Sequence, residues 1–132
     1  PQADLRGADM PLFMIKAKYS EDSLKAMTEK PSDRPHALTQ AVSAHGGNLH
    51  LFYWAFGEFD AVAVFDAPTN QAAKSVEMML GASGAISSYE ISTLLTNAQA
   101  MEAMRRAQSV DTNFKSPQKE WEGWRDYGGE AG

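Results

Sequence analysis

The most constraining feature of the sequence is the apolar run at residues 52–65, FYWAFGEFDAVAVF, in which two strand-like segments meet at Gly57. A single glycine beside an acidic and aromatic cluster predicts a tight β-hairpin between them. Both arms are too apolar for either to keep a freely solvated face. We therefore expect a sheet that is covered on both sides, by helices on one face and by a second subunit on the other.

Length and charge narrow the class of protein. The 132 residues suit one domain with one core. Lys and Arg number 12 against 17 Asp and Glu, which gives a net charge of −5. This charge lacks the basic excess that phosphate backbones attract, so we expect no nucleic-acid partner. The absence of Cys excludes disulfides, thiolate metal sites and Cys nucleophiles.

Nothing in the sequence indicates a membrane protein. No apolar run approaches the roughly 20 residues that span a bilayer. Residues 1–9 are polar, lack periodicity and do not resemble a signal peptide, so we interpret them as a leader or an expression scar. The prediction is a cytoplasmic protein without a membrane partner.

Hydrophobic periodicity and turn residues predict an alternating order of strands and helices. We expect strands at 12–19, 48–56, 58–65 and 85–95, a short helix from Ser20 to Lys30, and helices at about 32–45 and 70–81. Two helical segments thus separate the first two strands. The overall order, β-α-β-β-α-β, predicts an α+β, ferredoxin-like fold with an antiparallel sheet.

The C-terminal part adds a helix and a tail. The sequence TNAQ at 96–99 matches a capping box, and an amphipathic helix follows with Glu102 and Arg106 as an i,i+4 ion pair. We therefore place the domain at residues 10–107. Residues 108–132 form a polar tail that contains Trp121 and Trp124, and disordered tails are usually poor in aromatics. We expect the tail to dock on its own domain or on a neighbour, and a flexible end is the alternative.

Alternation along the strands assigns the sheet residues to two faces. The face toward the helices should carry Phe13, Ile15, Ala17, Phe59, Ala61, Ala63, Phe65 and Ile91. The other face should carry Met14, Lys16, Lys18, His50, Phe52, Trp54, Val62, Val64, Ser88, Glu90 and Ser92. Between two such faces a cavity could form, with Trp54, Phe52 and Met14 as its apolar walls and Lys16, His50 and Glu90 as its polar groups.

This polar set has two interpretations. His50, with Lys16 and Glu90 nearby, could act as a general acid–base group on an enolisable or hydroxylated substrate. The simpler interpretation, which we favour, is an ion pair between Lys16 and Glu90 and a hydrogen bond from His50 at a dimer interface. Glu58 and Asp60 beside Gly57 more often serve the turn than catalysis. No spacing of the histidines indicates a metal site, and no motif identifies a cofactor.

Several of these features together resemble the GYD domain family. They are Phe52-Tyr53, then Gly57-Glu58-Phe59-Asp60 at the start of the next strand, then Ala67-Pro68 before an Ala-rich helix. Phe59 stands where the family signature has Tyr, so a phenol hydroxyl is missing there. The resemblance covers about residues 11–106 and implies a dimeric α+β barrel, in which two ferredoxin-like sheets pack face to face. That group includes small isomerases, monooxygenases and haem proteins, so the resemblance implies architecture better than chemistry.

Two functions remain open. The first is a homo-oligomeric domain, dimeric or larger, that binds a small organic molecule between its sheets, as a small isomerase or a cofactor-independent oxygenase. The second is a non-catalytic assembly or scaffold protein whose aromatic tail docks on a neighbouring subunit or another partner. A cavity requires space between the sheets, whereas an assembly module requires a closed face.

Overall fold

The computed structural model describes residues 10–110, 114 and 117. Contacts divide the chain into two units, residues 1–96 and 97–132, and each is described by itself. The first unit contains β1 (Leu12–Tyr19), α2 (Glu21–Glu29), α3 (Arg34–Ala44), β2 (Asn48–Trp54), β3 (Ala61–Asp66), α4 (Asn70–Ala82) and β4 (Ile86–Leu94). The second contains α5 (Asn97–Ser109). The residues predicted as a leader, 1–9, and most of the predicted tail lie outside the described residues.

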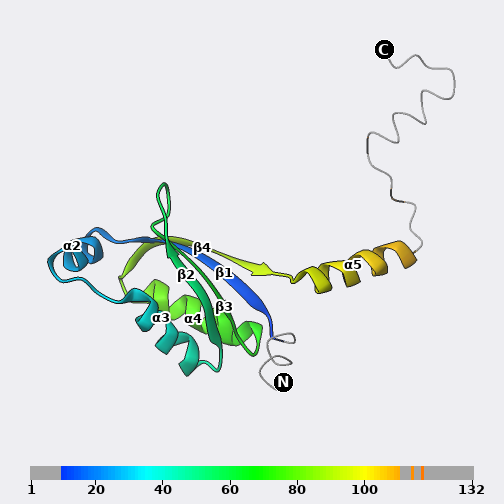
Figure 1. Ribbon diagram of the computed structural model, residues 1–132, viewed down its shortest axis with the longest axis horizontal. Coiled ribbons are helices and arrows are strands. Elements are labelled where there is room, and N and C mark those ends of the chain that lie inside the picture. Colours follow the sequence, from blue (N-terminus) through cyan, green and yellow to red (C-terminus); the bar gives the residue numbers. More distant parts are fainter. Residues whose placement is uncertain (1–9, 111–113, 115–116, 118–132) are drawn as a thin grey trace, which may run out of the picture. The chain divides into compact units, whose positions relative to one another are not determined.

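The four strands form one antiparallel sheet in the order β2-β3-β1-β4. Both α3 and α4 lie on the same face of this sheet, and α2 lies beyond one end of it (Figure 1). The order of strands and helices confirms the predicted α+β, ferredoxin-like fold, with two helices in the first crossover. Among the described residues of this unit, no helix lies on the opposite face of the sheet, and we call it the open face.

Side-chain caps fix where the helices of this unit begin. Each of the three starts after a residue whose side chain accepts a hydrogen bond from the backbone N–H three positions on: Ser20 for α2, Asp33 for α3 and Thr69 for α4. Such a cap satisfies one of the N–H groups that the first helical turn leaves unpaired. The first two helices therefore begin where the sequence predicted them.

The core lies between the sheet and the helices α3 and α4. The rings of Phe13 on β1 and Phe65 on β3 stack with their centroids 5.6 Å apart. The helices contribute Leu38, Val42 and Val76 to the same cluster. Alternation on β1 and β3 therefore predicted the buried face correctly.

A close approach of two backbone segments explains the glycine that follows α3. A Cβ atom at Gly47 would overlap the backbone carbonyl oxygen of Asp66 and would crowd the side chain of Val42. The preceding Gly46 has a φ of +83°, which side chains rarely adopt. Both predicted helix-ending glycines are therefore required here, for different reasons.

The hairpin between β2 and β3 is looser than predicted. The strands end at Trp54 and begin again at Ala61, so residues 55–60 form a loop. Gly57 has the expected positive φ, +102°. Asp60 closes the loop, since its carbonyl oxygen accepts a hydrogen bond from Ala55 N at 2.8 Å and its carboxylate accepts one from Tyr19 N at 2.9 Å. Asp60 therefore serves the loop, as predicted, through its backbone carbonyl, whereas its carboxylate binds the backbone amide of Tyr19 at the end of β1.

A β-bulge in β2 changes the faces that alternation predicted. Leu49 lies opposite Phe65 and Leu51 lies opposite Val64, so His50 is an extra residue between them. An extra residue shifts the alternation of every later position on that strand. The side chains after His50 therefore lie on the face opposite to the one predicted.

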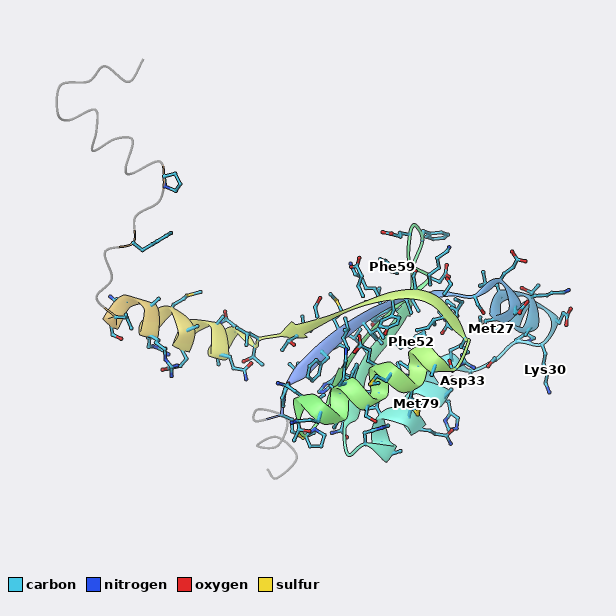
Figure 2. All side chains as sticks on the ribbon, turned by 180° about the vertical axis from the view of Figure 1, so that it is seen from behind. Met27, Lys30, Asp33, Phe52, Phe59 and Met79 are labelled. Atoms are coloured by element: carbon cyan, nitrogen blue, oxygen red, sulfur yellow. The ribbon has the colours of Figure 1, made fainter. Side chains whose placement is uncertain are left out.

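The aromatic residues of β2 show the effect of this shift. Phe52 lies opposite Ala63 and Trp54 lies opposite Ala61, and both partners are buried on the helix side. Figure 2 shows Phe52 on the side of the sheet that faces α4. Tyr53 instead lies on the open face. The prediction that Phe52 and Trp54 line the open face was wrong because it assumed an unbroken strand.

Phe59 is also on the opposite side from the one predicted. It lies in the loop, outside both strands, and Lys16 Nζ lies 5.3 Å from the centre of its ring. Figure 2 shows Phe59 on the other side of the sheet from Phe52. Residues in a loop do not follow strand alternation, so the assignment of Phe59 to the helix side failed.

In the second unit, α5 confirms the predicted C-terminal helix. Its ion pair joins Glu102 to Arg105, with 3.1 Å between Oε1 and Nη1, instead of the predicted pair with Arg106. Both i,i+3 and i,i+4 positions are neighbours on a helix, so the sequence could not decide between two adjacent arginines. The predicted docking residues Trp121 and Trp124 lie outside the described residues.

Candidate functional site

The structure pairs two of the three predicted polar groups. Lys16 on β1 lies opposite Glu90 on β4, and 3.5 Å separates Nζ from Oε1. Both side chains are partly exposed, 37% and 60%, on the open face. An ion pair this exposed contributes at most about 1 kcal/mol to stability. The geometry fits the simpler interpretation of these residues, an ion pair between Lys16 and Glu90 on the surface of the sheet.

His50 has a different partner. Its Nε2 lies 2.8 Å from Oδ2 of Asp66, a side chain with only 1% of its surface exposed. The other carboxylate oxygen of Asp66 accepts hydrogen bonds from the backbone N of Asn48 at 2.7 Å and from its Nδ2 at 3.2 Å. Three nitrogen atoms, one from His50 and two from Asn48, therefore lie within hydrogen-bond distance of this buried side chain. Asp66 was not among the predicted site residues, although a polar residue at the end of an apolar strand is a visible signal in the sequence.

The three predicted catalytic residues do not converge. On β3, Asp66 and Val62 are four positions apart, and Val62 is the residue opposite Lys16. At about 3.3 Å per residue, His50 and the Lys16–Glu90 pair are separated by roughly 13 Å along the sheet. No three His, Asp or Glu side chains in the described residues gather as a metal site would require. Within one chain, two of the three predicted residues form an ion pair, and His50 lies apart from them beside Asp66.

The predicted apolar walls are also divided. Met14 keeps its predicted place on the open face, where it lies opposite Val64 and Ser92. Phe52 and Trp54 lie on the helix side, with their rings in an edge-to-face contact at 5.7 Å. Trp54 also contacts the ring of Tyr19, with the centroids 5.5 Å apart. The two predicted aromatic walls therefore lie on the other face of the sheet, where Phe52, but not Trp54, lines a cavity.

The cavity has a volume of about 90 Å³ and lies between the sheet and the helices. Phe52 forms part of its wall and lies between the sheet and α4 in Figure 2. Apolar walls with few polar groups are typical of small-molecule sites. The principal apolar side chains are Ile15, Leu38, Phe52, Leu80 and Ile86, and the polar ones are Tyr19 and Arg34. We call this space the inner cavity.

A second hollow adjoins the inner cavity beneath α2. It has a volume of about 300 Å³ and shares three lining residues with the inner cavity: Tyr19, Arg34 and Ala85. Its remaining walls come from α2 and the segment after it, including Met27 and Lys30. We call it the outer cleft. The three shared residues form a junction between an apolar interior and a more polar entrance.

The junction contains two interacting polar side chains. Burial raises the pKa of Tyr19 above its ordinary value of 10.0, and the Arg34 guanidinium partly lowers it through a hydrogen bond and its charge. The carboxylate of Asp60 raises it further. Tyr19 is therefore a neutral phenol at physiological pH, able to donate a hydrogen bond.

Arg34 is only partly satisfied. Its Nη1 donates to Ser32 Oγ at 3.3 Å, whereas its Nε is buried without a hydrogen-bond partner. Sequence reasoning did not identify this residue, because a lone arginine at a helix start carries no motif. Its interaction with Tyr19 joins two residues that lie fifteen positions apart in the sequence, on either side of α2.

The described helices include none that is long and apolar enough to cross a membrane.

Among solved structures, MtbAldR shares 11% identity and a TM-score of 0.49, over 67% of this chain and 55% of its own. A nipsnap family protein of unknown function from Agrobacterium tumefaciens shares 12% identity and a TM-score of 0.38, over 64% of this chain and 86% of its own. A dimeric ferredoxin-like protein from an uncultured marine organism shares 13% identity and a TM-score of 0.35, over 81% of this chain and 94% of its own.

The sequence comparisons give a more specific result. None of the curated proteins compared with the chain matches it. The GYD domain matches residues 13–104, from β1 into α5. This range includes the hairpin and the Ala-Pro turn on which the predicted resemblance rested. The chain belongs to the GYD domain family.

Proposed function

We propose that the protein is a homo-oligomeric domain that binds a small organic molecule in the inner cavity of each protomer. The observation that carries this proposal is the cavity itself, an apolar space between sheet and helices with Tyr19 and Arg34 at its junction with the outer cleft. Its lining includes Phe52, which the bulge at His50 turns toward the helices. This location replaces the sheet-to-sheet cavity expected from the sequence.

The exposed apolar residues of the open face support the proposed oligomer. There Leu51 and Tyr53 leave 38% and 67% of their surfaces exposed, beside the half-buried Met14, Val62 and Val64. Contiguous exposed apolar surface of this kind marks a contact site for another molecule. Because every protomer carries the same face, a pair of protomers could cover both faces around a two-fold axis.

An isomerase or cofactor-independent oxygenase activity would require a group that transfers a proton. Tyr19 is the ionisable acid that lines the inner cavity. A catalytic role for His50, Lys16 and Glu90 stays a prediction tied to a space between paired sheets. It would require a partner protomer to bring the two separated pairs to one ligand.

A matched pair of variants on α3 tests the cavity. Ala37 lines the inner cavity, and Ala44 is exposed at the other end of the same helix. Ala37→Leu should fill part of the cavity and abolish binding of a small aromatic compound such as benzyl alcohol, detected by ligand-observed NMR. Ala44→Leu makes the same change outside the cavity and should bind as the wild type does. Equal binding by both variants would contradict the proposal.

The assembly alternative is supported by α5. Its Met101 and Met104 leave 43% and 64% of their surfaces exposed, at the spacing of one helix face. An amphipathic helix with such residues is suited to contact a partner. Removal of residues 97–132 should then reduce the oligomer size in sedimentation equilibrium, whereas the proposed pairing through the open face predicts an unchanged dimer.

A further inference from the structure

The inner cavity and the outer cleft adjoin at three shared residues, and their other lining side chains differ in chemistry. The inner cavity is lined by apolar side chains such as Ile15, Leu38 and Leu80. The outer cleft opens beneath α2, where Ser23 and Ser32 add hydroxyl groups. A ligand that fills both spaces needs an apolar body and a polar group, and its polar group would lie at the junction.

Arg34 determines the charge of that polar group. Arg34 lines both spaces, and its guanidinium carries a positive charge at their junction. An acceptor atom supplied by a ligand at this junction gains a hydrogen bond from the guanidinium and the attraction of its positive charge. The adjacent phenol of Tyr19 can donate a second hydrogen bond to the same group.

We propose that the ligand is a small organic carboxylate, with an aromatic or branched aliphatic body in the inner cavity and its carboxylate bound by Arg34. This inference rests on the proposed function, since it requires that the inner cavity be the binding site. A carboxylate is planar and offers two oxygen acceptors, which match two neighbouring N–H groups of a guanidinium.

The charges around the junction favour an anion with a single charge. Arg34 is the cation that the two spaces share, and Lys30, which lines only the outer cleft, extends away from the domain in Figure 2. The carboxylate of Asp60 acts electrostatically on Tyr19 and already accepts the backbone N–H of that residue. A phosphate monoester would bring close to two negative charges to one guanidinium beside this carboxylate.

The test compares two probes of the same shape with different charge. Benzoate and benzamide share a ring and a planar polar group, but only benzoate is negatively charged at pH 7.5. For the wild-type chain, titration followed by ligand-observed NMR should give a dissociation constant for benzoate at least tenfold below that for benzamide. Arg34→Gln should reduce this ratio to within about twofold, because it removes the charge and keeps a polar side chain.

Two further variants serve as controls. Lys25→Gln removes the same amount of charge from an exposed position on α2 that lines neither space, and it should keep the preference for benzoate. A loss of the preference there would indicate general electrostatic attraction instead. Arg34→Lys retains the charge without the planar pair of N–H groups and should give an intermediate ratio. Circular dichroism of each variant establishes that the fold is intact before titration.

The outcomes separate the two proposals. Equal binding of benzoate and benzamide, both lost in Ala37→Leu, would refute the carboxylate inference and leave the cavity as the binding site. Absence of binding by either probe would refute both proposals. Tighter binding of phenyl phosphate than of benzoate would also overturn the carboxylate assignment. A benzoate preference that Arg34→Gln removes and Lys25→Gln keeps would support both.

Discussion

Neighbouring aromatic residues on β2 should respond in opposite ways to truncation. Phe52 packs against the core, whereas Tyr53 is 67% exposed on the open face. Replacing a fully buried Phe by Ala costs about 3–5 kcal/mol, so a half-buried Phe52 should cost roughly 2 kcal/mol in the free energy of unfolding. At about 4–8 °C per kcal/mol for a domain of this size, Phe52→Ala should lower Tm by roughly 10 °C. Tyr53→Ala should change the free energy of unfolding of a protomer by no more than about 0.5 kcal/mol.

Urea unfolding monitored by far-UV circular dichroism measures both variants without relying on tryptophan emission, which the nearby Trp54 would complicate. The proposed dimer adds a term that depends on protein concentration, so the titration is repeated over a hundredfold range. Phe52→Ala should lower the midpoint by the same amount at every concentration. Tyr53→Ala should lower it only at high concentration, where protomers pair.

The loss of stability of the two variants at the lowest protein concentration shows which of the two residues faces the helices. If Tyr53→Ala were the more destabilising there, Tyr53 would face the helices and the bulge at His50 would be absent. The assignment of Phe52 to the inner cavity would then fail as well. Similar losses for both variants would also refute the reasoning, because the two faces of β2 would be equally buried.

Three other perturbations follow from local geometry. Gly47→Ala should lower the free energy of unfolding, measured by urea titration, by about 3 kcal/mol or more, because the new Cβ would overlap the carbonyl of Asp66. A loss under about 1 kcal/mol would contradict this close approach of the two backbone segments. Thr69→Ala removes the hydroxyl that accepts the N–H of Ala72 at 3.0 Å and should cost about 1 kcal/mol, whereas an unchanged Tm would deny the cap a role. Because the pKa of Tyr19 is raised in the folded state, the unfolded chain releases the phenol proton first as the pH rises. Wild-type stability should therefore fall as pH rises above about 10 and through the folded-state pKa. The urea midpoint of Tyr19→Phe should not show this fall, and parallel pH profiles for the two proteins would contradict the prediction.

Most of the fold was predictable because its signals are local. The alternating strand at Leu12–Tyr19 needs only its own sequence, and the caps at Ser20 and Asp33 act within one helical turn. Alternation on β1 and β3 identified the buried face because neither strand contains an extra residue between the positions that pair with each other. When the local signals of each segment agree with the overall fold in this way, the fold can be predicted from one sequence.

The error on β2 arose from one extra residue, His50, between two paired positions of the strand. In sequence, His50 is one residue of an apolar run, and nothing near it indicates a bulge. In the structure, its ring contacts Asp66, sixteen positions away, and the same carboxylate binds Asn48 at the start of the strand. Because the period of a strand is two, one extra residue exchanged the predicted faces of both Phe52 and Trp54.

The position of the candidate site follows from the same bulge. With regular alternation, Phe52 would lie on the open face, and one apolar wall of the inner cavity would be missing. The bulge places its ring opposite Ala63, a residue small enough to leave space beside it. The charged end of the site has a separate origin, because Tyr19 ends β1 and Arg34 begins α3 after the intervening α2. A site assembled from strand ends, a helix start and one bulge has no sequence motif, so its chemistry becomes visible only when the register of β2 is known.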